Sequence, residues 1–362
     1  MNPQYFPILK VKPGELKALE KLSARSIAKI LPMFDLHRPK DGVTAIDHLD
    51  KLAYLISSAW SGGQVFVDIP RWRPNAQVEN GEHVLAYACS QLAMLGVPVS
   101  AVASYDRWDD PEYQRALVGL SGEGQNTFCI RLEGDALEDI GDPDYFMDKL
   151  DEIIDRLDID PADCFVVVDL GDIFHSAVVD LMPVVTDALT LLEPKGFGGV
   201  VVAGCSLPTT VNQAVKKINS AGFVERREAV LWKSICAERR NTDIIFGDYG
   251  IRNPSGEEDV IAPNMNGKIR YTLANRYLVV RGHSIQVPPK GAQTHALAQY
   301  VINSGHYMGA GFSWGDQRIQ DCANLVFKGN AGDWIAIDTN HHLEAVLAEI
   351  FEFQRHVATL SL

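Results

Sequence analysis

The chain has 362 residues, of which 46% are hydrophobic and 22% charged, and its formal net charge is -14. This composition is typical of a folded globular protein, and the negative charge argues against a general nucleic-acid-binding or anionic-membrane surface. No apolar run approaches the roughly 20 residues of a membrane span, and the N-terminus lacks the apolar core of a signal peptide, so we expect a cytoplasmic protein.

Short runs rich in β-branched residues recur along the first 250 residues. They span residues 7–12, 30–36, 65–70, 99–105, 128–133, 165–171, 199–206 and 244–250. Segments with helical spacing of apolar residues lie between them, such as residues 14–30, 45–60 and 144–157. Eight strands that alternate with helices predict an α/β fold, a TIM-like (β/α)8 barrel. An open doubly wound sheet is the alternative, but no G-x-G-x-x-G motif follows the first strand.

The pattern changes after Gly250. Residues 267–285 alternate with period two, which predicts an antiparallel β-hairpin. A helical pattern follows at residues 292–305, then a Gly-rich segment at 309–319 and an amphipathic helix at 341–357. We therefore divide the chain into a barrel, residues 1–250, and a hairpin with C-terminal helices packed on the barrel, residues 251–362.

Polar residues appear where the predicted strands end, which is the mouth that carries ligand chemistry in this fold. Our candidate catalytic residues at this mouth are Lys10, Asp68, Arg131, Asp169, Asp248 and Tyr249. Such a ring can hold a polar ligand, and neighbouring carboxylates can shift one another's pKa for acid or base work. A self-neutralising salt-bridge network is an equally weighted interpretation.

Two of these acids directly follow buried apolar runs, in "VVVD" and "IFGD". A purely structural residue would not need to carry charge at that position. We therefore expect Asp169 and Asp248 to serve a ligand or a partner rather than stability.

Five candidate ligand-binding residues lie beyond the barrel: Arg270, Tyr271, Arg281, Trp314 and His342. Arg270 and Arg281 alternate along opposed strands, so they could clamp a phosphate or carboxylate from one face, or could pair with acids of the rim.

The Gly-rich segment and the final helix add further expectations. Trp314 is a candidate lid over the mouth, and Asp316 a candidate N-cap of a helix that begins near Arg318. His341 and His342 stand where the last helix is expected to begin. Adjacent residues face different sides of a helix, so we expect one to pack or cap and the other to reach the mouth.

Neither a metal nor a cofactor is assigned. The carboxylates of the mouth would suit Mg²⁺ or Mn²⁺, but Lys10 and Arg131 would compete for them. Lys10 ends the first strand, where racemase-type pyridoxal-phosphate barrels carry their Schiff-base lysine, but no Gly-rich phosphate cup accompanies it, so we do not expect an imine there. The six cysteines are widely spaced and are expected to be buried thiols.

Several motifs together resemble the Beta protein family. They are "YFPILKVKPGELKAL" at the N-terminus, "KIRYT" and "LVVRG" in the hairpin, and the late "FSWGDQRI" and "NHHLEAV". They touch both ends of the chain, so the resemblance covers its full length. It implies a family of phages and bacteria, often encoded near mobile or defence-associated genes, and it implies no particular reaction.

Two functions fit these observations. The first is a ligand-binding or catalytic barrel that acts on a small anionic or phosphorylated molecule. The second is a non-catalytic acidic barrel that binds a protein partner, for example a basic nuclease-like subunit of a phage-defence module. The polar mouth favours the first, and the lack of a complete catalytic set favours the second.

Overall fold

The computed structural model describes residues 3–239, 243–256 and 265–360. Its core is a closed barrel of eight parallel strands in the order β1-β2-β3-β4-β5-β6-β7-β9, which confirms the predicted barrel. The strands are β1 (Tyr5–Lys10), β2 (Met33–Asp35), β3 (Val65–Asp68), β4 (Val99–Ser104), β5 (Cys129–Leu132), β6 (Phe165–Asp172), β7 (Gly199–Cys205) and β9 (Ile244–Asp248).

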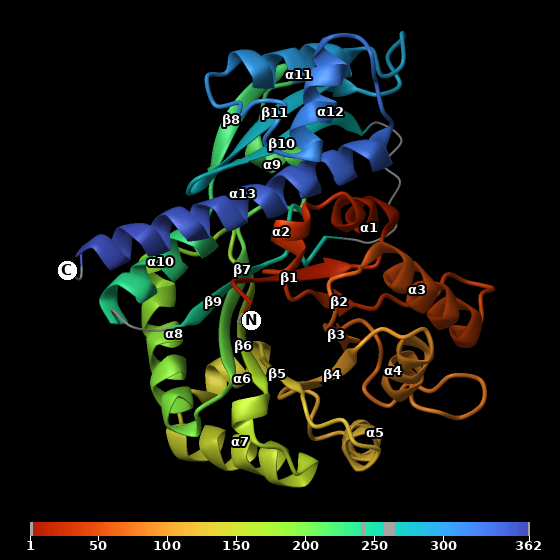
Figure 1. Cartoon of the computed structure of the whole chain (residues 1–362), viewed down its shortest axis with the longest axis vertical. Coiled ribbons are helices and arrows are strands. Elements are labelled where there is room, and N and C mark those ends of the chain that lie inside the picture. The colour runs from red at the N-terminus through yellow and green to blue at the C-terminus, as the bar shows by residue number, and fades with distance from the viewer. Residues whose placement is uncertain (1–2, 240–242, 257–264, 361–362) are drawn as a thin grey trace.

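Helices surround the barrel as an outer ring (Figure 1). They are α1 (Pro13–Glu20), α2 (Ala24–Ile27), α3 (Ala45–Ala59), α4 (Val84–Met94), α5 (Pro111–Gly122), α6 (Gly134–Asp139), α7 (Pro143–Leu157), α8 (Val178–Leu192) and α10 (Arg227–Arg239), with short 3₁₀ turns η1 (Pro161–Asp163) and η2 (Glu193–Lys195). Several begin with side-chain caps: Asp110 accepts from the amides of the first turn of α5, and Asp142 does so for α7. A proline follows each of these caps, where its missing N–H costs no hydrogen bond.

The barrel interior is filled, not hollow. Residues two apart along each strand point inward, and the lowest layer stacks Phe6, Phe66 and Phe165 with ring centroids 5.8, 6.5 and 5.5 Å apart. Smaller residues above them, such as Met33 and Val167, complete the same buried apolar cluster. The barrel interior is therefore a packed core, as is usual for this fold.

A second, three-stranded antiparallel sheet has the order β10-β11-β8. β10 (Asn266–Leu273) and β11 (Arg276–Ser284) are the predicted hairpin, with Asn275 in a left-handed conformation at the turn. The sequence analysis missed β8 (Ser220–Glu225), which follows the short helix α9 (Val211–Ala214) and pairs with β11. This sheet thus takes one strand from the connection between β7 and β9.

The two faces of this sheet pack on different partners. Tyr277 and Val279 belong to the same buried cluster as the barrel interior. Ile269, Leu278 and Val280 instead pack with α11 (Gln293–Asn303) and α12 (Trp314–Ala323). The sheet is therefore a layer between the barrel and two C-terminal helices, above the barrel in Figure 1.

The final helix, α13 (Ala331–Leu360), runs between the barrel and the sheet (Figure 1). It packs on α1, and the approach is close: a Cβ on Gly14 would lie 2.6 Å from Cγ2 of Ile335. The helix begins ten residues before the predicted start at residue 341. Its first turns carry Asp338, Thr339 and Asn340 in buried positions, which hides the helical pattern of apolar residues. None of the helices in the described ranges, α13 included, combines the length and apolar character that crossing a membrane requires.

We predict that Gly247→Ala destabilises the barrel, because the added Cβ would lie 2.8 Å from Cγ1 of Val201 and 2.9 Å from Cβ of Ala203. Overpacking of this kind costs about 1 to 3 kcal/mol of the free energy of unfolding, measurable by urea denaturation. Gly119→Ala is the matched control, because Gly119 is exposed in α5 with open space around it. Gly119→Ala should raise the free energy of unfolding by up to about 1 kcal/mol. Equal changes in Gly119→Ala and Gly247→Ala would contradict the packing argument.

Candidate functional site

The C-terminal ends of the strands place polar side chains on the inner side of the barrel. Lys10, Asp35 and Asp68 lie side by side in register on β1, β2 and β3. Arg131 and Asp169 occupy the corresponding ends of β5 and β6, and Tyr249 follows β9. Each of these six residues lies two or four positions after an apolar residue that points into the barrel. Because side chains two apart on a strand point to the same side, all six point into the same mouth.

Arg131 is the centre of this arrangement and is only 2% exposed. Its Nη1 donates to Asp35 at 2.9 Å and to Asp68 at 2.7 Å, while its Nε and Nη2 donate to one oxygen of Asp169 at 2.8 and 2.6 Å. Nη2 also donates to the hydroxyl of Tyr249 at 2.8 Å, and that hydroxyl donates to Asp169 at 2.6 Å. Every N–H of the guanidinium therefore has an acceptor within the protein.

Two further side chains complete this group, which we call the mouth cluster: Asp35, Asp68, Arg107, Arg131, Glu133, Asp169 and Tyr249. Arg107 donates to the second oxygen of Asp68 at 2.5 Å. Glu133 lies 3.3 Å from Nε of Arg131, and its side chain is 27% exposed. The cluster thus combines four carboxylates with two guanidinium groups, and among its ion-paired side chains Glu133 is the most exposed to solvent.

The acids of the mouth cluster are not equivalent. Burial raises the pKa of Asp35 to about 6, although Arg131 opposes this. Burial likewise raises the pKa of Glu133 to about 7, with Arg131 again opposing and Asp169 adding to the increase. For Asp68 burial acts in the same direction, but Arg107 and Arg131 together hold its pKa below the ordinary value. The cluster therefore holds carboxyl groups that gain or lose a proton near neutral pH.

A second set of charges borders the mouth on the side of the hairpin. We call it the basic rim: Lys10, Lys12, Arg252, Lys268 and Arg270. Lys10, Lys12 and Arg252 all act electrostatically on the buried Glu15 of α1, and Asp35 of the mouth cluster acts on it as well. Arg270 donates from Nη1 to the carbonyl of Ile251 at 2.7 Å. The basic rim is therefore continuous with the mouth cluster.

Two buried carboxylates beside the basic rim have incomplete hydrogen bonding. Oε2 of Glu15 and Oδ1 of Asp338 have no partner among the described residues, although Glu15 is only 2% exposed and Asp338 is fully buried. Burial raises the pKa of Glu15 to about 7 and that of Asp338 to about 6. The other oxygen of Asp338 accepts from Nε and the backbone N–H of Arg270, both at 3.1 Å.

The structure places Asp248 away from the mouth cluster. Adjacent residues of β9 alternate, so Tyr249 points into the barrel while Asp248 points outward. Its carboxylate accepts from the hydroxyl of Tyr5 at 2.5 Å and contacts Nε2 of His342 at 2.9 Å. Nδ1 of His342 lies 2.8 Å from the hydroxyl of Thr272 on β10. Burial lowers the pKa of His342, so we assign it as a neutral imidazole that bridges barrel and sheet.

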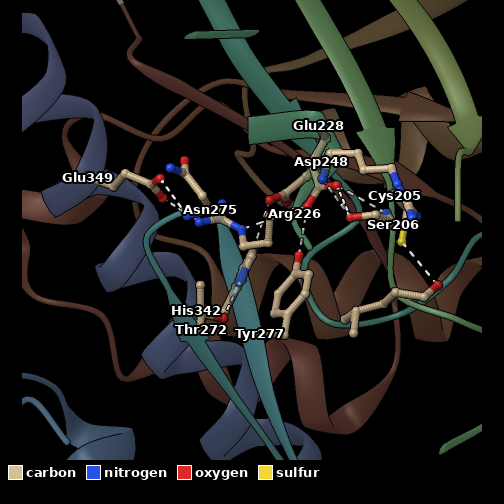
Figure 2. Close-up of polar contacts among 12 residues, drawn as sticks. Cys205, Ser206, Arg226, Glu228, Asp248, Thr272, Asn275, Tyr277, His342 and Glu349 are labelled. Atoms are coloured by element: carbon tan, nitrogen blue, oxygen red, sulfur yellow. Dashed lines mark hydrogen bonds and ion pairs between the residues drawn. The ribbon is translucent and has the colours of Figure 1, made fainter. Parts of the chain in front are cut away.

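Figure 2 shows that this contact belongs to a larger buried network, which we call the seam network. Arg226 donates to Glu349 of α13 and to the carbonyl of Leu273. Glu228 accepts from Ser206 at the end of β7 and from the hydroxyl of Tyr277 on β11. The seam network therefore ties the barrel, the sheet and α13 together through largely buried, hydrogen-bonded side chains.

The remaining candidates from the C-terminal part lie outside the mouth cluster. Tyr271 faces α12 and donates to Asp316 at 2.6 Å, and Arg281 donates to the carbonyls of Val215 and Lys216 at 2.7 Å each. Trp314 opens α12 and packs beside the sheet, with Lys17 5.9 Å from its ring centroid. These contacts are internal to the protein.

Two sequence expectations about the C-terminal helices are wrong. Ser313, not Asp316, caps α12, which begins at Trp314; Asp316 is one turn inside and accepts from Tyr271 and Ser313. His341 and His342 lie in the middle of α13 and both are fully buried. They do face different sides, since His341 contacts Asp316 at 2.8 Å and His342 contacts Asp248.

Neither of two cavities described in the structure coincides with the mouth. One of about 500 Å³ lies between α4 and α5 and is lined in part by Glu82, Glu112, Glu123 and Arg115. Another of about 150 Å³ lies near the N-terminal ends of the strands, beside Gln4 and Asp243. Within the described ranges, no three His, Cys, Asp or Glu side chains are grouped so that they could share a metal ion. All six cysteines are free thiols, and burial raises the pKa of Cys205 far above its ordinary value.

Comparison with known proteins gives one specific match. A family model described as Beta protein matches residues 5–348. No curated protein matches the chain in sequence.

Similar solved structures are distant. Streptococcus suis SuiB bound to S-adenosylmethionine is 10% identical with a TM-score of 0.33, over 68% of this chain and 50% of that one, so this chain spans about half its length. The enoyl reductase domain of MlnA from the macrolactin biosynthesis cluster of Bacillus amyloliquefaciens is 10% identical with a TM-score of 0.36, over 97% of this chain and 81% of that one. Neither likeness carries an argument about a ligand.

We predict that Arg131→Met strongly destabilises the protein, because it leaves Asp35, Asp68 and Asp169 buried without their common donor. Breaking a buried ion pair on one side costs about 3 to 5 kcal/mol of the free energy of unfolding, measurable by chemical denaturation. The control Arg115→Met removes a side chain that is 75% exposed, and its effect should stay within about 0.5 kcal/mol. A loss below about 1 kcal/mol in Arg131→Met would show that the cluster does not hold the barrel mouth.

We further predict that Glu15→Gln stabilises the protein at about pH 8 but not below about pH 4.5. The folded-state pKa of Glu15, about 7, exceeds the ordinary 4.5. The folded protein therefore retains a proton that the unfolded chain releases, so wild-type stability falls as pH rises through this window. At high pH the free energy of unfolding of Glu15→Gln should exceed that of wild type by at most about 3 kcal/mol, measured by urea denaturation at a series of pH values. Glu20→Gln, on the exposed side of the same helix, should show no such pH dependence.

Proposed function

The chain belongs to the Beta protein family, whose name assigns no reaction, and we propose from the geometry of the mouth that it binds a small anionic molecule there. The observation that carries this proposal is the basic rim. Among the described residues, the side chains of Lys268 and Arg252 make no hydrogen bond or ion pair, although they lie in a cluster with Arg270. Cations gathered without matching acceptors are suited to an anionic group of a ligand.

Arg131 does not bind that anion in this proposal. Its donors are all taken by Asp35, Asp68, Asp169 and Tyr249, so an external anion would have to displace a buried carboxylate. The mouth cluster instead offers carboxylate oxygens. A ligand that carries an anionic group at one end and hydroxyl, amide or amine donors at the other would match both halves of the mouth.

The mouth cluster also suits proton transfer. Glu133 is partly exposed, and its pKa of about 7 places both protonation states within reach near neutral pH. A carboxyl group in that condition is an effective general acid or base. We therefore favour a catalytic barrel over one that only stores its ligand, with Glu133 as the group that exchanges a proton with the bound molecule.

The cavity between α4 and α5 favours a second candidate function. Three of its lining residues, Glu82, Glu112 and Glu123, are acidic, and only Arg115 opposes them. A basic segment of a protein partner would complement this charge. In this version the barrel is a non-catalytic subunit, for example beside a nuclease-like protein of a phage-defence module.

Native mass spectrometry of the protein purified from its own host tests the proposal and separates it from the second candidate. We predict that wild type retains a small-molecule mass and that Arg252→Gln loses it. Arg156→Gln removes an exposed cation on α7, far along the chain from the rim, and should retain the same mass. A small-molecule mass unaffected by Arg252→Gln would contradict the basic rim as its site. A retained polypeptide without any small molecule would support the partner function instead.

A further inference from the structure

We propose that Lys268 is a nucleophilic amine that forms an imine with a small carbonyl compound carrying a carboxylate or phosphate group. This inference rests on the proposed binding of an anionic molecule at the mouth and specifies the class of that molecule.

Lys268 lies on the face of β10 that is turned toward the barrel. The next residue, Ile269, packs on the other face with α11 and α12, and in the register of the hairpin Lys268 is opposite Arg281. Lys268 is half-buried, and its amine makes no hydrogen bond or ion pair with any described residue. Because no described residue occupies this half-buried amine, we treat it as available to a ligand.

The surroundings of Lys268 favour the neutral amine. Burial comes first, and the guanidinium groups of Arg270 and Arg252 add to it; together they lower the pKa of Lys268 to about 8. Asp338 opposes them, but one of its oxygens is already held by Arg270. A lysine beside other cations in a desolvated site is the general arrangement that produces a nucleophilic amine near neutral pH.

The neighbouring groups match the steps of imine formation. The neutral amine of Lys268 attacks the carbonyl carbon as the C–O π bond breaks, and a proton passes from the nitrogen to the oxygen, which gives a carbinolamine. Loss of its hydroxyl as water then gives the C=N bond, with no oxidation or reduction. Asp338 acts electrostatically on Lys268 and has a pKa of about 6, so it can donate the proton that the departing hydroxyl needs. Arg252 is the cation available to hold the anionic group of the substrate.

Lys10 has different surroundings. Its neighbour in strand register is Asp35, whereas two of the three charged groups that act on Lys268 are guanidinium groups, which disfavour its ammonium form. The reactive lysine of this mouth is thus supplied by the hairpin, not by the first strand of the barrel.

Reductive trapping tests the inference on the wild-type protein. Glyoxylate, an aldehyde with a carboxylate, is added with sodium cyanoborohydride, and the reduced adducts are mapped by peptide mass spectrometry over time. At about pH 7.5 we expect Lys268 to be labelled at least about tenfold faster than the exposed Lys51, because burial and two neighbouring guanidinium groups lower the pKa of Lys268. Acetaldehyde, which lacks the anionic group, serves as the neutral comparison.

Variants distinguish the parts of the proposal. Arg252→Gln should slow labelling of Lys268 by glyoxylate but not by acetaldehyde, and Arg156→Gln, which removes an exposed cation on α7, should leave labelling of Lys268 unchanged. Labelling of Lys268 no faster than that of Lys51, or preferential labelling of Lys10, would overturn the inference. If labelling fails in this way but native mass spectrometry shows a small molecule that wild type retains and Arg252→Gln loses, the proposed binding function stands and only the imine is excluded. Rapid labelling of Lys268 in a protein that retains no small molecule would leave the reactive amine and remove the binding function.

Discussion

The ion pairs of Arg131 are the interaction on which the mouth of this barrel depends. Inward positions at the ends of β2, β3 and β6 are all aspartates, and three carboxylates this close would repel one another strongly without a central cation. A planar guanidinium can satisfy all of them at once because its donors point in fixed, divergent directions. The same saturation leaves Arg131 without a spare donor for an anion, which is why the proposed function assigns the anion to the basic rim.

The seam network determines where that rim lies. His342 joins Asp248 of the barrel to Thr272 of β10, and Arg226 joins the sheet to Glu349 of α13. Because these contacts are buried and hydrogen-bonded, they fix the hairpin against the barrel. Lys268 and Arg270 are thereby held beside the barrel mouth, although neither belongs to a barrel strand. The candidate site is therefore composite, with acids from the barrel and the cations Arg252, Lys268 and Arg270 from the segment that follows it.

Much of the fold was predictable from sequence because each barrel strand is a short apolar run between helical segments. The exceptions have local causes. β8 was missed because "SAGFVE" is short, half-exposed and contains Gly, so it lacks the buried apolar run of the other strands. The start of α13 was missed because buried polar residues such as Asn340, which donates to the carbonyl of Ala18, interrupt its apolar pattern. Asp316 looked like a cap, but buried contacts to Tyr271 and His341 explain its charge.

Membership of the candidate site could be predicted from the sequence only where the sequence also shows which way a side chain points. Asp169 and Asp248 follow runs of the same kind, yet one enters the mouth cluster and the other the seam network. A parallel strand buried on both faces shows no alternation of apolar and polar residues. Its sequence therefore does not reveal whether its odd-numbered or its even-numbered residues point into the barrel. The register of neighbouring strands supplies that information: Asp35 and Asp68 are aligned, whereas Asp248 is paired with Pro7, three residues before Lys10 on β1. Within such a strand, a terminal carboxylate is equally suited to a ligand or to a structural contact. The residue beside it, here Tyr249, is then the one that enters the barrel.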